Sequence, residues 1–268
     1  MDRLNDRVIL ITGSTGIAAA AAERLVGEGA SLFVTSRTAK HARDLAERVG
    51  AAWAQAELTE EAAVNAAVTA AVERFGRIDG LFSVAGGSGR RFGDGPVHTL
   101  TGDAWEATAA INLRTQVLVC AAVTRQMLAQ PPNDSGTRGS ILLMGSVTAS
   151  DPAPELFATH AYAAAKGALT ALMTTMAATY APAGIRVNTV APSLTRTPMA
   201  GRAAGDPEIL AYAQRKQPLA GEMLEPDEVA KAAVYFLSDE SRAVTGQLLK
   251  VDGGWSVTSV SPELEPRR

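Results

Sequence analysis

Seven short apolar runs recur along the chain, and longer segments with helical patterns separate them. The runs lie at residues 7–12, 31–36, 51–56, 78–84, 139–144, 185–191 and 247–251. The helical segments lie at residues 17–27, 39–49, 60–75, 103–127, 160–180 and 226–237. Strands that are apolar throughout are typically buried on both faces of a sheet, and strand–helix alternation favours parallel pairing.

This alternation predicts an α/β fold. We expect a doubly wound, Rossmann-type sheet, mostly parallel and seven-stranded, with helices on both faces in three α/β/α layers. No linker or internal repeat divides the sequence, so we expect residues 1–268 to form a single dinucleotide-binding and catalytic domain. Residues 194–218 follow the sixth run, where doubly wound sheets bind ligands, and we expect them to form either a mobile substrate lid or a surface loop with a short helix. Residues 258–268 form a polar tail.

Composition excludes several classes of function. The net charge is −3 and no run of Lys or Arg is present, which argues against nucleic acid or an anionic membrane as partner. One cysteine and three scattered histidines predict neither an intramolecular disulfide nor a metal site. We find no signal-like N-terminal segment and no apolar run of the ~20 residues that a membrane span needs, so we expect a cytoplasmic protein.

The first run leads directly into a glycine-containing turn and then a helix. The turn reads Gly13, Ser14, Thr15, Gly16 and Ile17. At a helix N-terminus the free backbone N–H groups and the helix dipole attract phosphate, and glycine lets the backbone approach it closely. We therefore expect these five residues to bind the pyrophosphate of a dinucleotide cofactor.

The end of the second run predicts which cofactor binds. An acidic residue there would hydrogen-bond the adenosine ribose, whereas a basic one would pair with a 2′-phosphate. The chain has Ser36 and Arg37, with Lys40 one turn on. This pattern favours NADP over NAD, and NAD remains the alternative.

Tyr162 and Lys166 stand four residues apart in the segment 160–180. On a helix this spacing places both side chains on one face. A free tyrosine has a pKa near ~10 and is a poor acid–base catalyst at neutral pH, but a nearby ammonium favours the phenolate. The pair is thus a candidate for proton transfer, with Lys166 predicted to lower the pKa of Tyr162.

Together these motifs resemble the short-chain dehydrogenase/reductase family, in its compact single-domain branch. The resemblance covers nearly all of residues 7–255 and depends on the order of the motifs. Besides the glycine turn and the Tyr/Lys pair, the motifs are Ser83-Val84-Ala85-Gly86, Asn112, Gly145-Ser146, Ile185-Arg186-Val187-Asn188, Ala191-Pro192-Ser193, Thr197-Pro198-Met199 and Val251-Asp252-Gly253-Gly254.

The resemblance implies a role for each site residue. Tyr162 would be the general acid in reduction and the general base in oxidation, and Lys166 would also bind the nicotinamide ribose. Ser146 would stabilise charge on the substrate oxygen, and Asn112 would hold a water that links Lys166 to solvent. The remaining cofactor contacts implied are Glu57, Leu58, Ala85, Gly86, Pro192, Thr195 and Thr197.

The chain departs from the family pattern at the turn, where Gly13 and Gly16 enclose two residues instead of three and Ala18 or Ala19 replaces a third glycine. We predict an NAD(P)-dependent oxidoreductase that acts on a small carbonyl or alcohol substrate, as a homotetramer or homodimer. Two alternatives remain open: an epimerase or dehydratase that retains its cofactor, and a nucleotide-sensing or scaffold protein without catalysis.

Overall fold

The computed structural model describes residues 2–259, so nearly all of the predicted polar tail lies outside the described residues. The strands are β1 (Val8–Thr12), β2 (Ser31–Ser36), β3 (Ala52–Gln55), β4 (Gly80–Ser83), β5 (Gly139–Met144), β6 (Ile185–Pro192) and β7 (Leu248–Val251). The helices that cover the sheet are α1 (Ile17–Gly27), α2 (Ala39–Val49), α3 (Glu61–Phe75), α5 (Thr115–Ala129), α7 (His160–Tyr180) and α10 (Pro226–Leu237).

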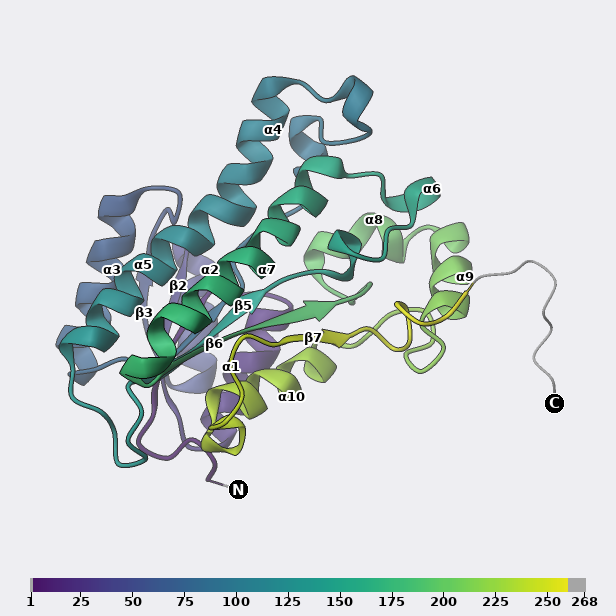
Figure 1. Ribbon diagram of the computed structural model, residues 1–268. Coiled ribbons are helices and arrows are strands. Elements are labelled where there is room, and N and C mark those ends of the chain that lie inside the picture. The colour runs from purple at the N-terminus through teal and green to yellow at the C-terminus, as the bar shows by residue number, and fades with distance from the viewer. Residues whose placement is uncertain (1, 260–268) are drawn as a thin grey trace.

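The strands form one seven-stranded sheet in the order β3-β2-β1-β4-β5-β6-β7. Every neighbouring pair is parallel, which confirms the predicted fold class. The chain winds outward from β1 to β3 and then returns to β4 on the other side of β1 (Figure 1). Ligands of doubly wound sheets bind at such a change of direction, beyond the carboxyl ends of the strands.

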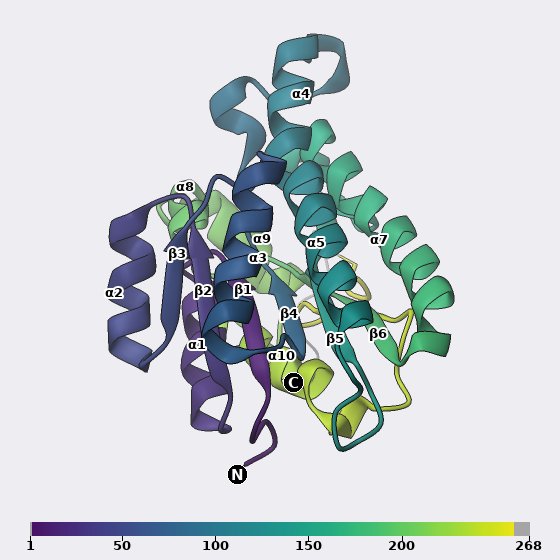
Figure 2. The same ribbon diagram turned by 90° about the vertical axis from the view of Figure 1, so that its left-hand side faces the viewer.

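Helices cover both faces of the sheet (Figures 1 and 2). One apolar core joins the strands to α3, α5 and α7, and a second joins them to α1, α2 and α10. The inner strands are buried along their whole length, as their uninterrupted apolar sequences predict. At the edge, β3 alternates between partly buried and exposed residues.

The segment predicted as one helix at 103–127 has an interruption. It consists of α4 (Gly102–Ala109), a π-helical turn (Ala110–Arg114) and α5. Two side chains in this region donate hydrogen bonds to backbone carbonyls. The Asn112 amide donates to the Thr108 carbonyl oxygen, and the Thr115 hydroxyl donates to the Ile111 carbonyl oxygen. Such local bonding, together with bonds from Asn112 to another loop, favours a π-turn, and π-turns are frequent at functional sites.

The continuous stretch Gly102–Ala129 is long and apolar enough to span a membrane, contrary to our reading of the sequence. Half of its apolar window is buried inside the protein, where α5 contributes Val119, Val123 and Met127 to a core shared with the sheet. Core helices of sheet proteins pass the same test of length and composition, so this stretch gives no reason to expect a membrane.

The predicted lid is largely helical. Within residues 194–218 the structure has α8 (Gly201–Ala204) and α9 (Pro207–Lys216). The Asp206 carboxylate accepts hydrogen bonds from two backbone N–H groups at the start of α9, and Ile209 and Ala213 are buried. The segment therefore has a packed helical base.

Candidate active site

The predicted site residues converge on the carboxyl edge of the sheet because each motif directly follows a strand. The glycine turn follows β1, Gly86 follows β4, Ser146 follows β5 and Thr197 follows β6. Contacts between these segments are direct: a Cβ placed on Gly16 would lie 2.9 Å from Thr197 Cγ2. The sheet thus brings together residues that are far apart in sequence.

The shortened glycine turn retains the properties that bind phosphate. Gly13 and Gly16 have positive φ angles of 93° and 56°, which other residues rarely adopt. Gly16 begins α1, where no side chain caps the helix and no acidic residue occupies the first turn. Ala18, at the position of the missing third glycine, is buried and lies 3.5 Å from the Cβ that Gly13 would carry. These features are compatible with a phosphate at the turn, and pyrophosphate binding stays a prediction.

Asn112 links the π-turn to the loop after β4. Its amide nitrogen donates to the Gly87 carbonyl (2.9 Å), and its oxygen accepts from the Gly87 N–H (3.1 Å). Gly86 is closely surrounded, since a Cβ there would lie 2.8 Å from Asn112 Oδ1 and 3.7 Å from Lys166 Nζ. Gly86 thus lies close to both Asn112 of the π-turn and Lys166 of α7.

Lys166 is buried, with 2% of its surface exposed. Its Nζ donates to the Met144 carbonyl at 2.8 Å, and this carbonyl also accepts from the Gln116 amide. Burial lowers the pKa of Lys166 to about 7, because desolvation disfavours the charged ammonium. Lys166 therefore exchanges its proton near neutral pH.

Tyr162 lies beside Lys166, whose Nζ is 5.6 Å from the centre of the phenol ring. Burial raises the pKa of the phenol, and the neighbouring Ser146 hydroxyl acts in the opposite direction. Desolvation is the largest cause of the pKa shift in both groups, and the effect of Lys166 on the phenol pKa stays a prediction. The spacing correctly predicted a shared face but could not reveal this burial.

Ser146 begins a 3₁₀ turn immediately after β5, with its backbone extended. Its Oγ lies 2.9 Å from Thr148 Oγ1 and accepts from the Thr148 N–H. These contacts orient the Ser146 hydroxyl beside Tyr162. A hydroxyl in this position can donate to a substrate oxygen and stabilise negative charge there.

Asp94, which our sequence analysis did not identify, caps the helix that carries Tyr162. Its carboxylate is buried and accepts from the N–H groups of Ala161 and Tyr162, at 3.0 Å each. The cap is not local, since Asp94 belongs to the loop after β4. His160, at the start of the same helix, accepts from the Val97 N–H at 3.0 Å.

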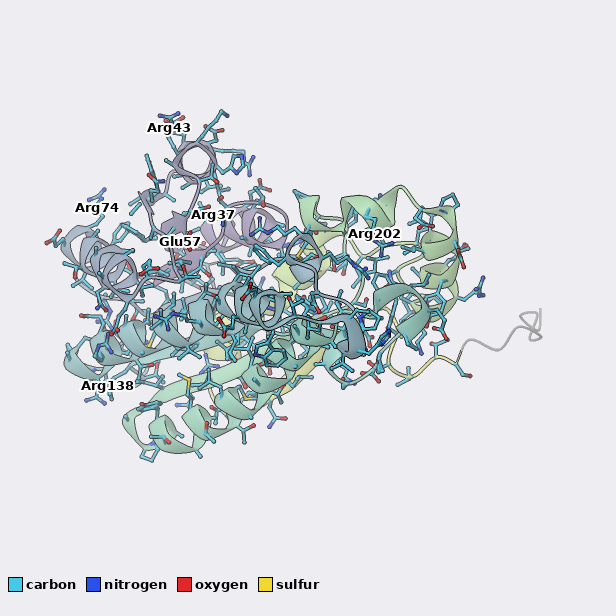
Figure 3. All side chains as sticks on the ribbon, turned by 90° about the horizontal axis from the view of Figure 1, so that it is seen from above. Arg37, Arg43, Glu57, Arg74, Arg138 and Arg202 are labelled. Carbon is cyan, nitrogen blue, oxygen red and sulfur yellow. The ribbon has the colours of Figure 1, made fainter. Side chains whose placement is uncertain are left out.

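The residues expected at the adenosine end line a cavity of about 490 Å³. Arg37 and Glu57, which are labelled side by side in Figure 3, contribute two of its side chains. Arg91 and Phe92, from the loop after β4, also line it, and the Arg91 guanidinium stacks 4.5 Å from the Phe92 ring centre. Phe92 was a possible pocket residue from the sequence, whereas Arg91 was missed, because nothing in a loop of this length indicates which way it folds back.

Other residues predicted near the adenosine have different surroundings. Ser36 ends β2 and is partly buried, and the Leu58 side chain packs into the core. Lys40 pairs with Asp44 of its own helix at 2.5 Å. Arg37 is thus the predicted basic residue that faces the cavity.

The segment after β6 is held by a buried glutamine. Gln217 accepts from the Ser193 hydroxyl at 2.7 Å and donates to the Leu194 carbonyl. Pro192 and Thr195 are buried, whereas Thr197 is partly exposed beside the glycine turn. Of the residues predicted here, Thr197 is therefore best placed to reach a cofactor.

A second cavity, of about 660 Å³, lies between the carboxyl end of β7 and the loop before α10. Its lining includes Arg196, Met223 and Asp252, but none of the predicted site residues. We therefore assign the candidate active site to the region around Tyr162 and not to this larger cavity.

Comparisons with known proteins agree with this geometry. A protein-family model described as enoyl-(acyl carrier protein) reductase matches residues 11–256. The short-chain reductase protein NovJ of Streptomyces niveus is 34% identical over 259 residues, which cover 93% of this chain and 94% of that protein.

Solved structures are also similar. A short-chain type dehydrogenase/reductase from Mycobacterium ulcerans has a TM-score of 0.86 at 28% identity, covering 95% of this chain and 91% of that one. A 3-ketoacyl-(acyl-carrier-protein) reductase from Brucella melitensis, in complex with NADH, has a TM-score of 0.84 at 27% identity. This second match covers 95% of this chain and 100% of the other.

Proposed function

Since the chain belongs to the short-chain dehydrogenase/reductase family, we propose that it interconverts a carbonyl and an alcohol with a preference for NADP(H), using Tyr162 as the proton donor and acceptor. The coarser statement is established by the family: the chain is an oxidoreductase that acts on CH–OH or C=O groups with a nicotinamide cofactor. The choice of NADP and the roles of individual residues are our proposal.

One observation carries the catalytic assignment: Tyr162, Lys166 and Ser146 meet at the sheet edge that also holds the glycine turn. The bound cofactor supplies or accepts the hydride. In reduction Tyr162 gives its proton to the substrate oxygen, while the Ser146 hydroxyl donates a hydrogen bond to that oxygen. Lys166, with a pKa of about 7, can return a proton to Tyr162 at neutral pH.

The test of this assignment is Tyr162→Phe, which removes the phenol proton and retains the ring. Positioned acid–base groups contribute ~10²–10⁴-fold to rate, so we expect a loss of this size in kcat with cofactor affinity unchanged. A panel of ketones reduced with NADPH, followed by cofactor absorbance, measures the first quantity, and fluorescence titration measures the second. Turnover equal to that of the unmodified enzyme would overturn the role of Tyr162.

The preference for NADP is supported by the two guanidinium groups of the adenosine cavity. Arg37 and Arg91 come from different segments and line the same cavity, opposed there by the single carboxylate of Glu57. Arginine binds phosphate through paired, charge-assisted hydrogen bonds. A 2′-phosphate in this cavity would gain from both side chains, whereas a ribose hydroxyl would not.

We would test this preference by thermal-shift titration with NADPH and NADH on the unmodified protein, Arg37→Gln and Arg91→Gln. A hydrogen bond to a charged group contributes about 1.5–3 kcal/mol, so each variant should lose ~10-fold or more in NADPH affinity and little in NADH affinity. Arg43→Gln, on the exposed face of α2, is the matched control. Equal stabilisation by both cofactors would refute the preference and leave the oxidoreductase assignment intact.

A further inference from the structure

Two arginines from different loops meet at one backbone oxygen. Arg90, in the loop after β4, donates to the Leu156 carbonyl at 3.1 Å, and Arg202, in α8, donates to the same oxygen at 3.2 Å. Leu156 lies in α6 (Pro154–Phe157), within the loop between Ser146 and Tyr162. The two guanidinium groups are therefore neighbours, and a neutral carbonyl is the acceptor that they share.

The positive charge of this pair is poorly neutralised within the protein. Among residues 2–259, no carboxylate lies within 4 Å of the Arg90 guanidinium, and the carboxylate nearest to Arg202 is that of Asp206, at 4.0 Å. Burial lowers the pKa of Arg90, and the charge on Arg202 lowers it further. Two adjacent cations that share one neutral acceptor retain free N–H donors, and an oxyanion would satisfy these donors and relieve the repulsion.

Both arginines contact the loop that connects Ser146 with Tyr162, and this contact relates the pair to the substrate. Arg90 closely follows Gly87, which contacts Asn112, and Arg202 closely follows Thr197 beside the glycine turn. The carboxylate of Asp94, close enough to Arg90 to affect its pKa, binds the N–H of Tyr162. The loops after β4, β5 and β6 thus hold the pair at the border of the catalytic region, and Figure 3 shows Arg202 well apart from Arg37 and Glu57.

We propose that Arg90 and Arg202 form a receptor for a compact oxyanion carried by the substrate. The enzyme would then act on a carbonyl or alcohol compound with a carboxylate or sulfonate group. The Leu156 carbonyl sets the separation of the two guanidinium groups, and the anion binds their remaining N–H donors. This inference rests on the proposed function, because it names the substrate class of the same site.

The test measures binding directly, so that it does not depend on turnover. Cyclohexanecarboxylate, cyclohexanesulfonate and the neutral cyclohexanecarboxamide are titrated by calorimetry into the protein saturated with NADP⁺, and again without cofactor. We expect at least one of the two anions to bind ~10-fold or more tightly than the amide, since charge-assisted hydrogen bonds carry the difference. Whichever anion binds more tightly identifies the substrate group.

Three variants locate the binding. Arg90→Gln and Arg202→Gln should each lower the affinity for the anion ~10-fold and leave the affinity for the amide unchanged. Arg202→Lys retains the charge but loses the paired N–H donors of the guanidinium, so its affinity for the anion should be intermediate. Arg43→Gln removes an equivalent charge elsewhere and should change nothing. Both arginines are exposed, so these variants are expected to fold, and the melting temperature of each variant verifies this.

Three outcomes would overturn the inference. The anions and the amide could bind with equal affinity, no probe could bind, or the arginine variants could lower the affinity for NADPH and not that for the anion. The third outcome would assign the pair to the cofactor. Failure of the proposed function has a different signature, because NADPH would then not bind or Tyr162→Phe would remain active, whereas anion binding without cofactor would still be measurable.

Discussion

Burial determines the charge of the two groups at the centre of the site. Lys166 is enclosed with a carbonyl as its partner, which lowers its pKa to about 7, and the Tyr162 phenol is enclosed beside it, which raises the phenol pKa. Both shifts have the direction expected when burial disfavours the charged form of a group.

The pKa of Lys166 has a consequence for stability. The folded value is about 7 and the unfolded value is near ~10.4, so between these pH values the unfolded chain binds the additional proton. Stability must then rise with pH across this window, and the cost of burying Lys166 is present in full below it. Relative to Lys166→Met, we expect the unmodified protein to gain melting temperature from pH 7 to pH 10.

Thermal denaturation of both proteins at several pH values measures this difference. Lys40→Met, which removes an exposed lysine of α2, is the control and should run parallel to the unmodified protein. Parallel curves for Lys166→Met as well would show that Lys166 does not titrate in this window.

At the residue scale, sequence predicted which side chains meet but not their environment. The four-residue spacing placed Tyr162 and Lys166 on one face, and the motif after β5 placed Ser146 near them. The burial that raises the pKa of Tyr162 was not predicted, because it depends on packing from other elements, and the spacing within one helix contains no information about them. Arg90 and Arg91 were missed for a related reason: they lie in a loop whose direction depends on distant contacts.

At the scale of elements, the start of α7 determines where Tyr162 lies. No side chain of α7 caps its own N-terminus, and the cap comes instead from the buried Asp94 of the β4 loop. A carboxylate at a helix N-terminus also interacts favourably with the helix dipole. Asp94 is therefore a positioning residue that couples the β4 loop to the catalytic helix.

We expect Asp94→Asn to lower kcat with little change in cofactor affinity. The amide retains one acceptor for two N–H donors and loses the charge, so stability should fall by about 0.5–2 kcal/mol, as for other lost caps. Asp103→Asn is the matched control, since it removes an exposed carboxylate from the first turn of α4. Denaturant unfolding measures the stability of each variant. If Asp94→Asn lost the expected stability but kept its kcat, Asp94 would have a purely structural role.

Elements were predicted well where their pattern is local. The buried inner strands and α1, α2, α7 and α10 follow from apolar periodicity. The division of 103–127 was not predicted, because the π-turn depends on bonds between Asn112 and Gly87 that periodicity cannot encode. The lid was expected to be mobile, and its helix α9 has a packed base because buried Ile209 and Ala213 join it to the body.

For the whole molecule, we propose that the half built on β4 to β7 serves the substrate, because it carries Ser146, Tyr162 and Lys166. The glycine turn follows β1, and the cavity that we propose for the adenosine is lined from both halves. All the described strands belong to one sheet. NovJ and the Mycobacterium ulcerans protein are named as a reductase and a dehydrogenase/reductase, which counts against a scaffold without catalysis.

Three aromatic rings join the substrate half. Trp255, after β7, is buried and stands edge-on to Phe157 of α6 (6.1 Å) and Tyr212 of α9 (5.7 Å). Its indole N–H donates to the Asp151 carbonyl at 3.1 Å, and Lys250 pairs with the Asp151 carboxylate. The cluster thus connects the segment after β7 to the loop between Ser146 and Tyr162 and to α9.

We expect Trp255→Phe to raise the KM for substrate and leave NADPH affinity unchanged, because the cluster contacts only the substrate half. Phenylalanine retains the ring packing but loses the hydrogen bond to Asp151, so the variant should fold, at a cost of about 0.5–1.5 kcal/mol for the lost bond. Trp53→Phe, at the partly exposed edge strand β3, is the control and should leave the substrate KM unchanged. Steady-state kinetics and NADPH titration separate the two halves: a parallel loss of substrate and cofactor binding in Trp255→Phe would mean that they do not act independently.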